Sequence, residues 1–111
     1  MTTYDTQMLK GVLSLLLLHL VVVREDYGYS LVLRLRESGF LEISEGTVYP
    51  GLTRLEAAGL LDSELVRSRS GPARKYYRAT DEGRAELARS AESWAALARA
   101  VDTILNTGSA G

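Results

Sequence analysis

Residues 44–59 read SEGTVYPGLTRLEAAG, and this stretch decides the fold. Its apolar residues have the spacing of a helix, yet it also contains residues that oppose helix formation. Gly46, Pro50 and Gly51 all lie in its first half. Glycine and proline destabilise the interior of a helix by about 1 and 3 kcal/mol respectively. A helix that contains three such residues therefore needs a compensating reason, which the rest of the chain must supply.

The residues of this stretch separate into two faces when they are placed on a helical wheel. The face expected to point inward holds Val48, Leu52, Leu55 and Gly59. The opposite face holds Gly46, Pro50, Thr53, Arg54 and Ala57. This outward face is small and carries charge only at Arg54, so it can approach another surface closely.

Two residues can begin this helix. Thr47 as the N-cap would put Pro50 at the third helical position, where a missing N–H leaves no hydrogen bond unmade. Ser44 as the N-cap would put Pro50 inside the helix and imply a kink. The sequence alone leaves both starts open.

Two helices are predicted before this stretch. The first is capped by Asp5 or Thr6 and continues to about Val23, and the second covers residues 29–38 with Gly39 as its C-terminal cap. The run VLSLLLLHLVVV at 12–23 is shorter than the roughly 20 apolar residues that span a bilayer, so we expect a core helix. Because this helix is apolar on every side, a second chain is expected to cover part of it.

Residues 60–79 change to an extended pattern, with LLDSELVR and RKYYRA separated by SRSGPA. This pattern predicts a β-hairpin with a loop longer than two residues. From residue 65 to 79 the hairpin carries five basic residues and no acidic one, namely Arg67, Arg69, Arg74, Lys75 and Arg78. It forms a local basic patch, with a solvated loop as the alternative interpretation.

Thr80 is expected to cap a last helix that runs to about Asn106, leaving a loose tail at 107–111. Its apolar residues follow a heptad pattern, which predicts packing against a partner helix. The pattern consists of Leu87, Ala91, Trp94, Ala98, Val101 and Leu105. Trp94 at such an interface is most simply core packing, but with the small Ala91 and Ala98 it can also line a slot for a flat ligand.

Composition limits the possible functions. The chain has 111 residues, a net charge of −1 and no cysteine, so it fits one domain without disulfides, thiolate metal sites or cysteine nucleophiles. The single histidine, His19, sits in an apolar run and is expected to be a buried residue rather than a ligand or a base. We expect no enzyme, no cofactor and no metal, because no activated nucleophile, ligand set or phosphate loop is visible.

Three helices followed by a basic hairpin is the order of a winged helix-turn-helix, in which the third helix enters the DNA major groove. The predicted fold class is therefore mainly helical with a small β-hairpin, as a winged helix-turn-helix domain plus a C-terminal dimerisation helix. Small residues at the start of the third helix would let its backbone approach phosphates. Tyr49 can donate to a phosphate, and Arg54 can reach a base edge, although either can also be an ordinary core or surface residue.

Four runs resemble the PadR family of bacterial transcriptional regulators, covering about residues 8–105. They are MLKGVLSLLLL (8–18), YGYSLVLRLRESG (27–39), SEGTVYPGLTRLEAAGLL (44–61) and GPARKYYRATDEG (71–83). The resemblance implies a homodimeric, cytoplasmic winged-helix repressor whose last helix pairs with the first and last helices of its partner.

Carried over by position, the resemblance assigns Thr47, Tyr49 and Pro50 to the recognition helix, Gly71 to the wing turn, and Arg74 with Lys75 to the basic pair of the wing. It also implies an effector site at the dimer interface in some members, near Trp94. With Arg69 and Arg54, these residues form the predicted DNA-binding set. We expect a 1–79 DNA-binding domain with its wing at 60–79, a dimerisation helix at 80–106 and a flexible tail at 107–111.

The sequence supports two functions from different classes. The first is a sequence-specific repressor that binds a pseudo-palindromic operator as a homodimer, with or without relief by a small aromatic ligand. The second is a winged-helix module that contacts proteins and binds no DNA. Nothing in the residues identifies the operator, the regulated genes or an effector.

Overall fold

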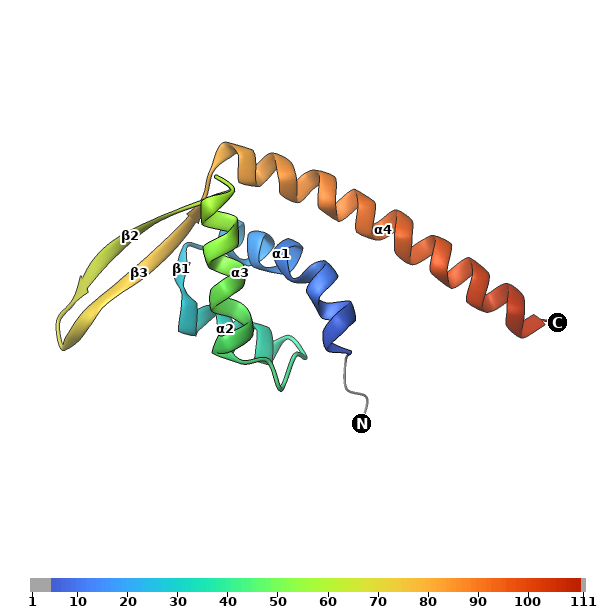
Figure 1. Cartoon of the computed structure of the whole chain (residues 1–111), viewed down its shortest axis with the longest axis horizontal. Coiled ribbons are helices and arrows are strands. Elements are labelled where there is room, and N and C mark those ends of the chain that lie inside the picture. Colours follow the sequence, from blue (N-terminus) through green and yellow to red (C-terminus); the bar gives the residue numbers. More distant parts are fainter. Residues whose placement is uncertain (1–4, 111) are drawn as a thin grey trace.

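The computed structural model describes residues 5–110 and confirms the predicted fold class, with helices throughout and a small sheet (Figure 1). The elements in chain order are α1 (Thr6–Val23), β1 (Asp26–Tyr27), α2 (Gly28–Glu37), α3 (Glu45–Ala57), β2 (Leu61–Ser68), β3 (Gly71–Ala79) and α4 (Asp81–Ala110). The first three helices pack together, the β2–β3 hairpin extends from them to one side, and α4 extends to the other (Figure 1).

Helix α1 is the central element of the core. Asp5 is its N-cap and accepts a hydrogen bond from the Gln7 amide at 2.7 Å. Its buried side chains are Leu9, Leu13, Leu17, Leu18 and Val21. The helix has 18 residues and is apolar enough to cross a membrane by length and composition, but this buried face makes it a core helix, as predicted. His19 is exposed, so the prediction of a buried histidine is wrong for the single chain.

The structure resolves the start of α3. Ser44 is the N-cap, so Pro50 lies inside the helix, where its ring removes one backbone hydrogen bond. Gly51 is buried, and a Cβ added there would lie 3.0 Å from Leu17 Cδ1 and 3.3 Å from Leu13 Cδ2. Gly51 therefore allows α3 to pack closely against α1, which is the compensating reason for that glycine.

The two faces of α3 were mostly predicted correctly. Val48, Leu52 and Leu55 are buried, and the residues of the outward face are all exposed. Gly59 does not belong to the inward face, because α3 ends at Ala57 and Gly59 follows it with a φ of +79°. The predicted position was wrong because the wheel was continued past the end of the helix.

The three strands form an antiparallel sheet in the order β1-β3-β2. The hairpin is longer than predicted: β2 and β3 pair from Leu61↔Ala79 to Ser68↔Gly71, leaving only residues 69–70 as the loop. Strand β1 was not predicted, and it pairs through Asp26↔Tyr77 and Tyr27↔Tyr76. This short strand attaches the base of the hairpin to the helices.

A buried carboxylate joins α1, β1 and α2. Asp26 is 5% exposed and accepts hydrogen bonds from Ser30 Oγ at 2.6 Å, the Tyr27 amide at 3.0 Å and Arg34 Nη1 at 3.1 Å. Arg34 also donates to the Leu20 carbonyl of α1 at 2.9 Å. Burial alone would raise the pKa of Asp26, but these hydrogen bonds and that from Arg24 lower it, so the group is charged at neutral pH.

Helix α4 begins as predicted, with Thr80 Oγ1 accepting a hydrogen bond from the Gly83 amide at 3.0 Å. Its first turns pack against α1, and its second half extends beyond the rest of the chain (Figure 1). The predicted tail at 107–111 is helical as far as Ala110, and Gly111 lies outside the described residues. The second half of α4 thus presents an uncovered apolar stripe.

Candidate nucleic-acid interface

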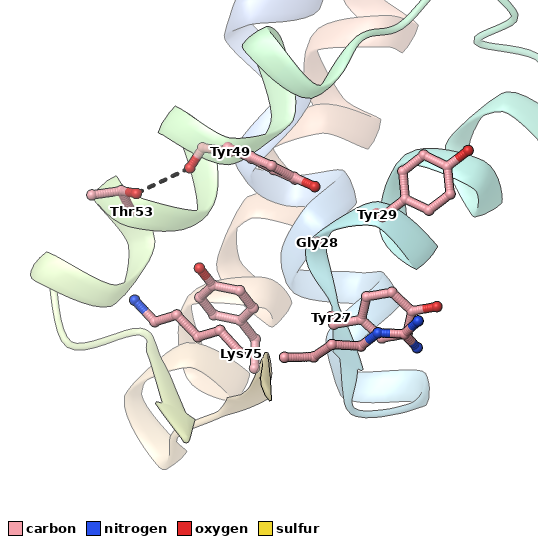
Figure 2. Close-up of a pocket in the computed structure, with 8 residues that line it drawn as sticks. Tyr27, Gly28, Tyr29, Tyr49, Thr53 and Lys75 are labelled. Atoms are coloured by element: carbon pink, nitrogen blue, oxygen red, sulfur yellow. Dashed lines mark hydrogen bonds between the residues drawn. The ribbon is translucent and has the colours of Figure 1, made fainter. Parts of the chain in front are cut away.

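A pocket of about 480 Å³ lies between the middle of β3, β1 and helices α2 and α3, and Figure 2 shows its lining. Four tyrosines and two cationic side chains surround it. The lining residues are Tyr27, Gly28, Tyr29, Tyr49, Thr53, Arg74, Lys75 and Tyr77. The pocket therefore combines flat aromatic walls with positive charge, a combination that suits an anionic group attached to an apolar or planar body.

Tyr49 reaches this pocket from α3. Its side chain is 41% exposed, and its ring packs so closely on Gly28 that a Cβ added there would lie 2.5 Å from Tyr49 Cε1. Partial burial, followed by the nearby Glu45 carboxylate, raises the pKa of Tyr49 above its ordinary value. The hydroxyl consequently stays protonated at neutral pH and can donate a hydrogen bond to an anion.

Lys75 enters the pocket from β3 and is not an isolated charge. Its Nζ lies 2.9 Å from Glu56 Oε1 on α3, and Glu56 also accepts a hydrogen bond from Ser63 Oγ at 2.5 Å. The bonds from Ser63 and Lys75 lower the pKa of Glu56, and Glu56 raises that of Lys75. The basic patch at residues 65–79 contains no acidic residue of its own, but Glu56 of α3 contributes a carboxylate to it.

Arg74 lies beside Lys75 in sequence and stacks on an aromatic ring. Its Cζ is 4.4 Å from the ring centroid of Tyr27, and the Tyr27 and Tyr76 rings are 5.3 Å apart at 59°. No acidic side chain of residues 5–107 pairs with Arg74. The Tyr27 ring thus contacts the guanidinium, while no carboxylate of residues 5–107 pairs with its charge.

The other predicted residues lie outside the pocket. Arg69 occupies the hairpin loop and Gly71 begins β3, so both are at the exposed tip of the hairpin. Along α3, Pro50 and Arg54 are exposed, and Thr47 is half-buried with its hydroxyl 3.4 Å from that of Ser44.

The structure thus places the predicted residues in three groups: Tyr49 with Arg74 and Lys75 in the pocket, the rest of the α3 set along that helix, and the tip of the hairpin. Sequence reasoning missed Tyr27, Tyr29 and Glu56 as neighbours of the basic pair. The pattern YGY at 27–29 marks two of them, but only the pairing of β1 with β3 brings Tyr27 to Arg74.

A second cavity, of about 500 Å³, lies between α1 and α4. Its lining consists of Gly11, Val12, Ser14, Leu15, Glu86, Arg89, Ser90, Ser93, Trp94 and Leu97. Trp94 is 49% exposed at this cavity. Ala91 and Ala98, which were predicted beside it, are not part of the lining.

Comparisons with known proteins agree with this architecture. Residues 17–89 match the model of the transcriptional regulator PadR-like family. The chain is 42% identical over 92 residues to the transcriptional regulator Rv3488 of Mycobacterium tuberculosis, covering 83% of this chain and 84% of that protein.

Solved structures give the same result. A PadR-like transcriptional regulator of Bacillus cereus shares 40% identity with a TM-score of 0.79, covering 89% of this chain and 96% of that one. A PadR family regulator of Eggerthella lenta shares 38% identity with a TM-score of 0.82, covering 90% and 87%. On the strength of the matching family model and these relatives, the chain belongs to the PadR-like family of transcriptional regulators.

Proposed function

We propose that this protein is a cytoplasmic, sequence-specific repressor that binds a pseudo-palindromic operator as a homodimer and blocks transcription by occupying it. The observation that carries the proposal is the pocket in which Tyr49 of α3 meets Arg74 and Lys75 of the hairpin. A hydroxyl donor and two cations around one opening suit a backbone phosphate, since charge-assisted hydrogen bonds to phosphate are strong and directional.

The three groups of predicted residues have different roles in this proposal. The pocket binds backbone phosphate and supplies affinity that depends on salt. Gly46 and Pro50 have small side chains that let the outward face of α3 approach DNA closely, and Arg54 contacts base edges in the major groove. Arg69 and Gly71 carry the tip of the hairpin, the wing, to the flanking DNA. In a dimer, two copies of α3 about 34 Å apart would read half-sites one helical turn apart.

The uncovered stripe on α4 supports the dimer. Its exposed apolar side chains include Trp94, Leu97, Val101, Ile104 and Leu105, with Ile104 71% exposed. A folded monomer rarely leaves such a row in water, and a heptad-spaced row is the surface that a second helix covers. With Leu87, the half-buried first residue of the heptad, it forms the interface that we propose.

A Val101→Glu chain is expected to be monomeric at concentrations where the wild type is a dimer. Burying one carboxylate per protomer without a partner costs about 3 kcal/mol, which corresponds to at least about a hundredfold weaker association. Sedimentation velocity over a range of micromolar concentrations measures the difference. Thr103→Glu is the matched control, because Thr103 is exposed two residues away and lies 200° around the helix. Equal masses for Val101→Glu and the wild type would contradict the proposed interface.

An effector site is a further part of the proposal, supported by the α1–α4 cavity and its tryptophan. A flat aromatic compound that stacks on Trp94 would also contact α1, and could shift one protomer against the other. Because the chain has a single tryptophan, any change in tryptophan fluorescence comes from Trp94. We expect quenching by aromatic ligands together with release of operator DNA. A broad panel of such ligands that quenches nothing would remove the effector from the proposal.

An electrophoretic mobility shift with the promoter directly upstream of this protein's own reading frame tests the function. We expect a discrete shifted band that survives an excess of unrelated duplex. The alternative function, a winged-helix module for protein contacts, predicts no shift with that promoter and tolerance of charge reversal in the wing.

A further inference from the structure

Tyr27 has no role in the predicted site, yet it contacts the cation that the DNA proposal depends on. The Arg74 guanidinium carbon lies 4.4 Å above the centre of the Tyr27 ring. Both residues line the pocket between β3 and the helices, and Figure 2 shows Tyr27 there. The contact is therefore part of the candidate interface and is formed between elements distant in sequence.

The Tyr27 ring has a fixed position. The backbone of Tyr27 pairs with Tyr76 across the sheet, and the Tyr27 amide donates to the buried Asp26 carboxylate at 3.0 Å. The Tyr27 and Tyr76 rings are in contact. Asp26 is in turn tied to α2 through Ser30. The Tyr27 backbone is consequently held by the sheet and the helical core at once, and its ring, which lies against that of Tyr76, forms a platform for Arg74.

A platform of this kind matters because a free arginine side chain has many rotamers, and ordering it on binding costs free energy. A guanidinium stacked on a ring keeps the edges of its N–H groups free, since the stack uses the flat face. No acidic side chain of residues 5–107 holds Arg74. Among residues 5–107, the contact with the Tyr27 ring orients it.

We propose that Tyr27 is a positioning residue for DNA binding: it holds the Arg74 guanidinium in the orientation in which it meets a backbone phosphate. This inference rests on the proposed function, because it needs Arg74 to contact DNA. It adds that DNA binding needs the ring beneath the arginine as well as the charge of the arginine.

Tyr27→Leu and Tyr27→Phe test the inference when their operator affinities are measured by fluorescence anisotropy. Leu removes the ring, and a lost exposed cation–π contact is expected to weaken binding about two- to fivefold per wing, or about four- to twenty-fivefold for a dimer. Phe keeps the ring and is expected to bind within about twofold of the wild type. Urea unfolding of each variant shows whether the fold is retained.

The salt dependence separates positioning from charge. Tyr27→Leu keeps every cation, so the slope of log K against log salt is expected to stay unchanged, whereas Arg74→Ala should reduce it by about 0.9 per protomer. In an Arg74→Ala background, Tyr27→Leu should cause no further loss of operator affinity. Arg74→Lys provides a second test without touching Tyr27: it keeps the charge and replaces the guanidinium that lies over the ring, so it should weaken binding at constant slope.

Two results would overturn the inference while leaving the DNA proposal intact. One is wild-type affinity in a folded Tyr27→Leu chain, and the other is an equal loss from Tyr27→Leu with and without Arg74. If the wild-type chain binds no duplex at all, the proposed function fails, and the inference fails with it.

Discussion

An Arg74→Ala/Lys75→Ala chain should bind its operator about a thousandfold more weakly than the wild type near 0.1 M salt. The double change removes both cations from the pocket in each protomer, four from a dimer. Each phosphate contact releases counterions and contributes about 0.9 to the slope of log K against log salt, so the slope should become shallower by about 3.6.

Glu56 makes this loss larger than a simple count of charges suggests. In the wild type its carboxylate is neutralised in part by Lys75 at 2.9 Å. Without Lys75 the carboxylate would face the DNA backbone unpaired and repel it. Anisotropy titrations at several salt concentrations measure both the affinity and the slope.

Arg84→Ala/Arg99→Ala is the matched control for this experiment. Both arginines are exposed on α4 and neither lines the pocket, and the change removes the same number of cations. We expect a much smaller change in slope, because these cations are not placed against phosphate. A slope in Arg74→Ala/Lys75→Ala equal to that of the wild type would mean that the pocket does not bind DNA.

An Asp26→Ala chain should lose about 3–5 kcal/mol of unfolding free energy, the usual cost of removing one partner from a buried ion pair. The change leaves Arg34, whose side chain is 16% exposed, without its carboxylate. It also removes the acceptor of the Ser30 hydroxyl and the Tyr27 amide. Urea unfolding followed by circular dichroism gives the difference directly.

The pH dependence of this loss follows from the pKa of Asp26, which folding lowers from 3.8. A carboxyl whose folded pKa is lowered contributes stability that is fully present above its unfolded pKa. That contribution is lost as the pH falls from about 3.8 through the lower folded pKa. The gap between wild type and Asp26→Ala should therefore be constant near neutral pH and become smaller below pH 3.8.

Glu64→Ala is the control for the stability experiment. Glu64 pairs with Arg78 at 3.4 Å, but both side chains are largely exposed, so its loss should cost at most about 1 kcal/mol. If Asp26→Ala were no less stable than Glu64→Ala, the buried carboxylate would not connect α1, β1 and α2 as described.

Local signals in the sequence predicted most of the elements. Asp5 and Thr80 cap their helices as their side-chain chemistry predicts, and the apolar spacing of α3 identified its buried face. The choice between Ser44 and Thr47 was not predictable, because both are good N-caps and the outcome depends on packing. Gly51 is an example of such packing: its role becomes visible only when α1 lies against α3.

The electrostatics of the candidate site depend on contacts between distant residues. Lys75 and Glu56 are 19 positions apart, and Arg74 meets Tyr27 across 47 positions, so no window of sequence contains either pair. The two-residue strand β1 has too few residues for an alternating pattern, although it sets the position of the Tyr27 ring. The sequence therefore identifies the cations of the hairpin but not the neighbours that contact or neutralise them.

The most direct test of the DNA-binding claim places a DNA-cleaving group on the tip of the wing. The chain has no cysteine, so a Ser70→Cys variant carries one thiol in the hairpin loop for attachment of an iron chelate, and Thr107→Cys on α4 is the control. On operator DNA, the Ser70 conjugate is expected to cut in two clusters placed symmetrically about the operator centre, while the Thr107 conjugate leaves the strands intact. Uniform cutting, or no cutting, by a Ser70 conjugate under conditions where the protein is dimeric would contradict the account.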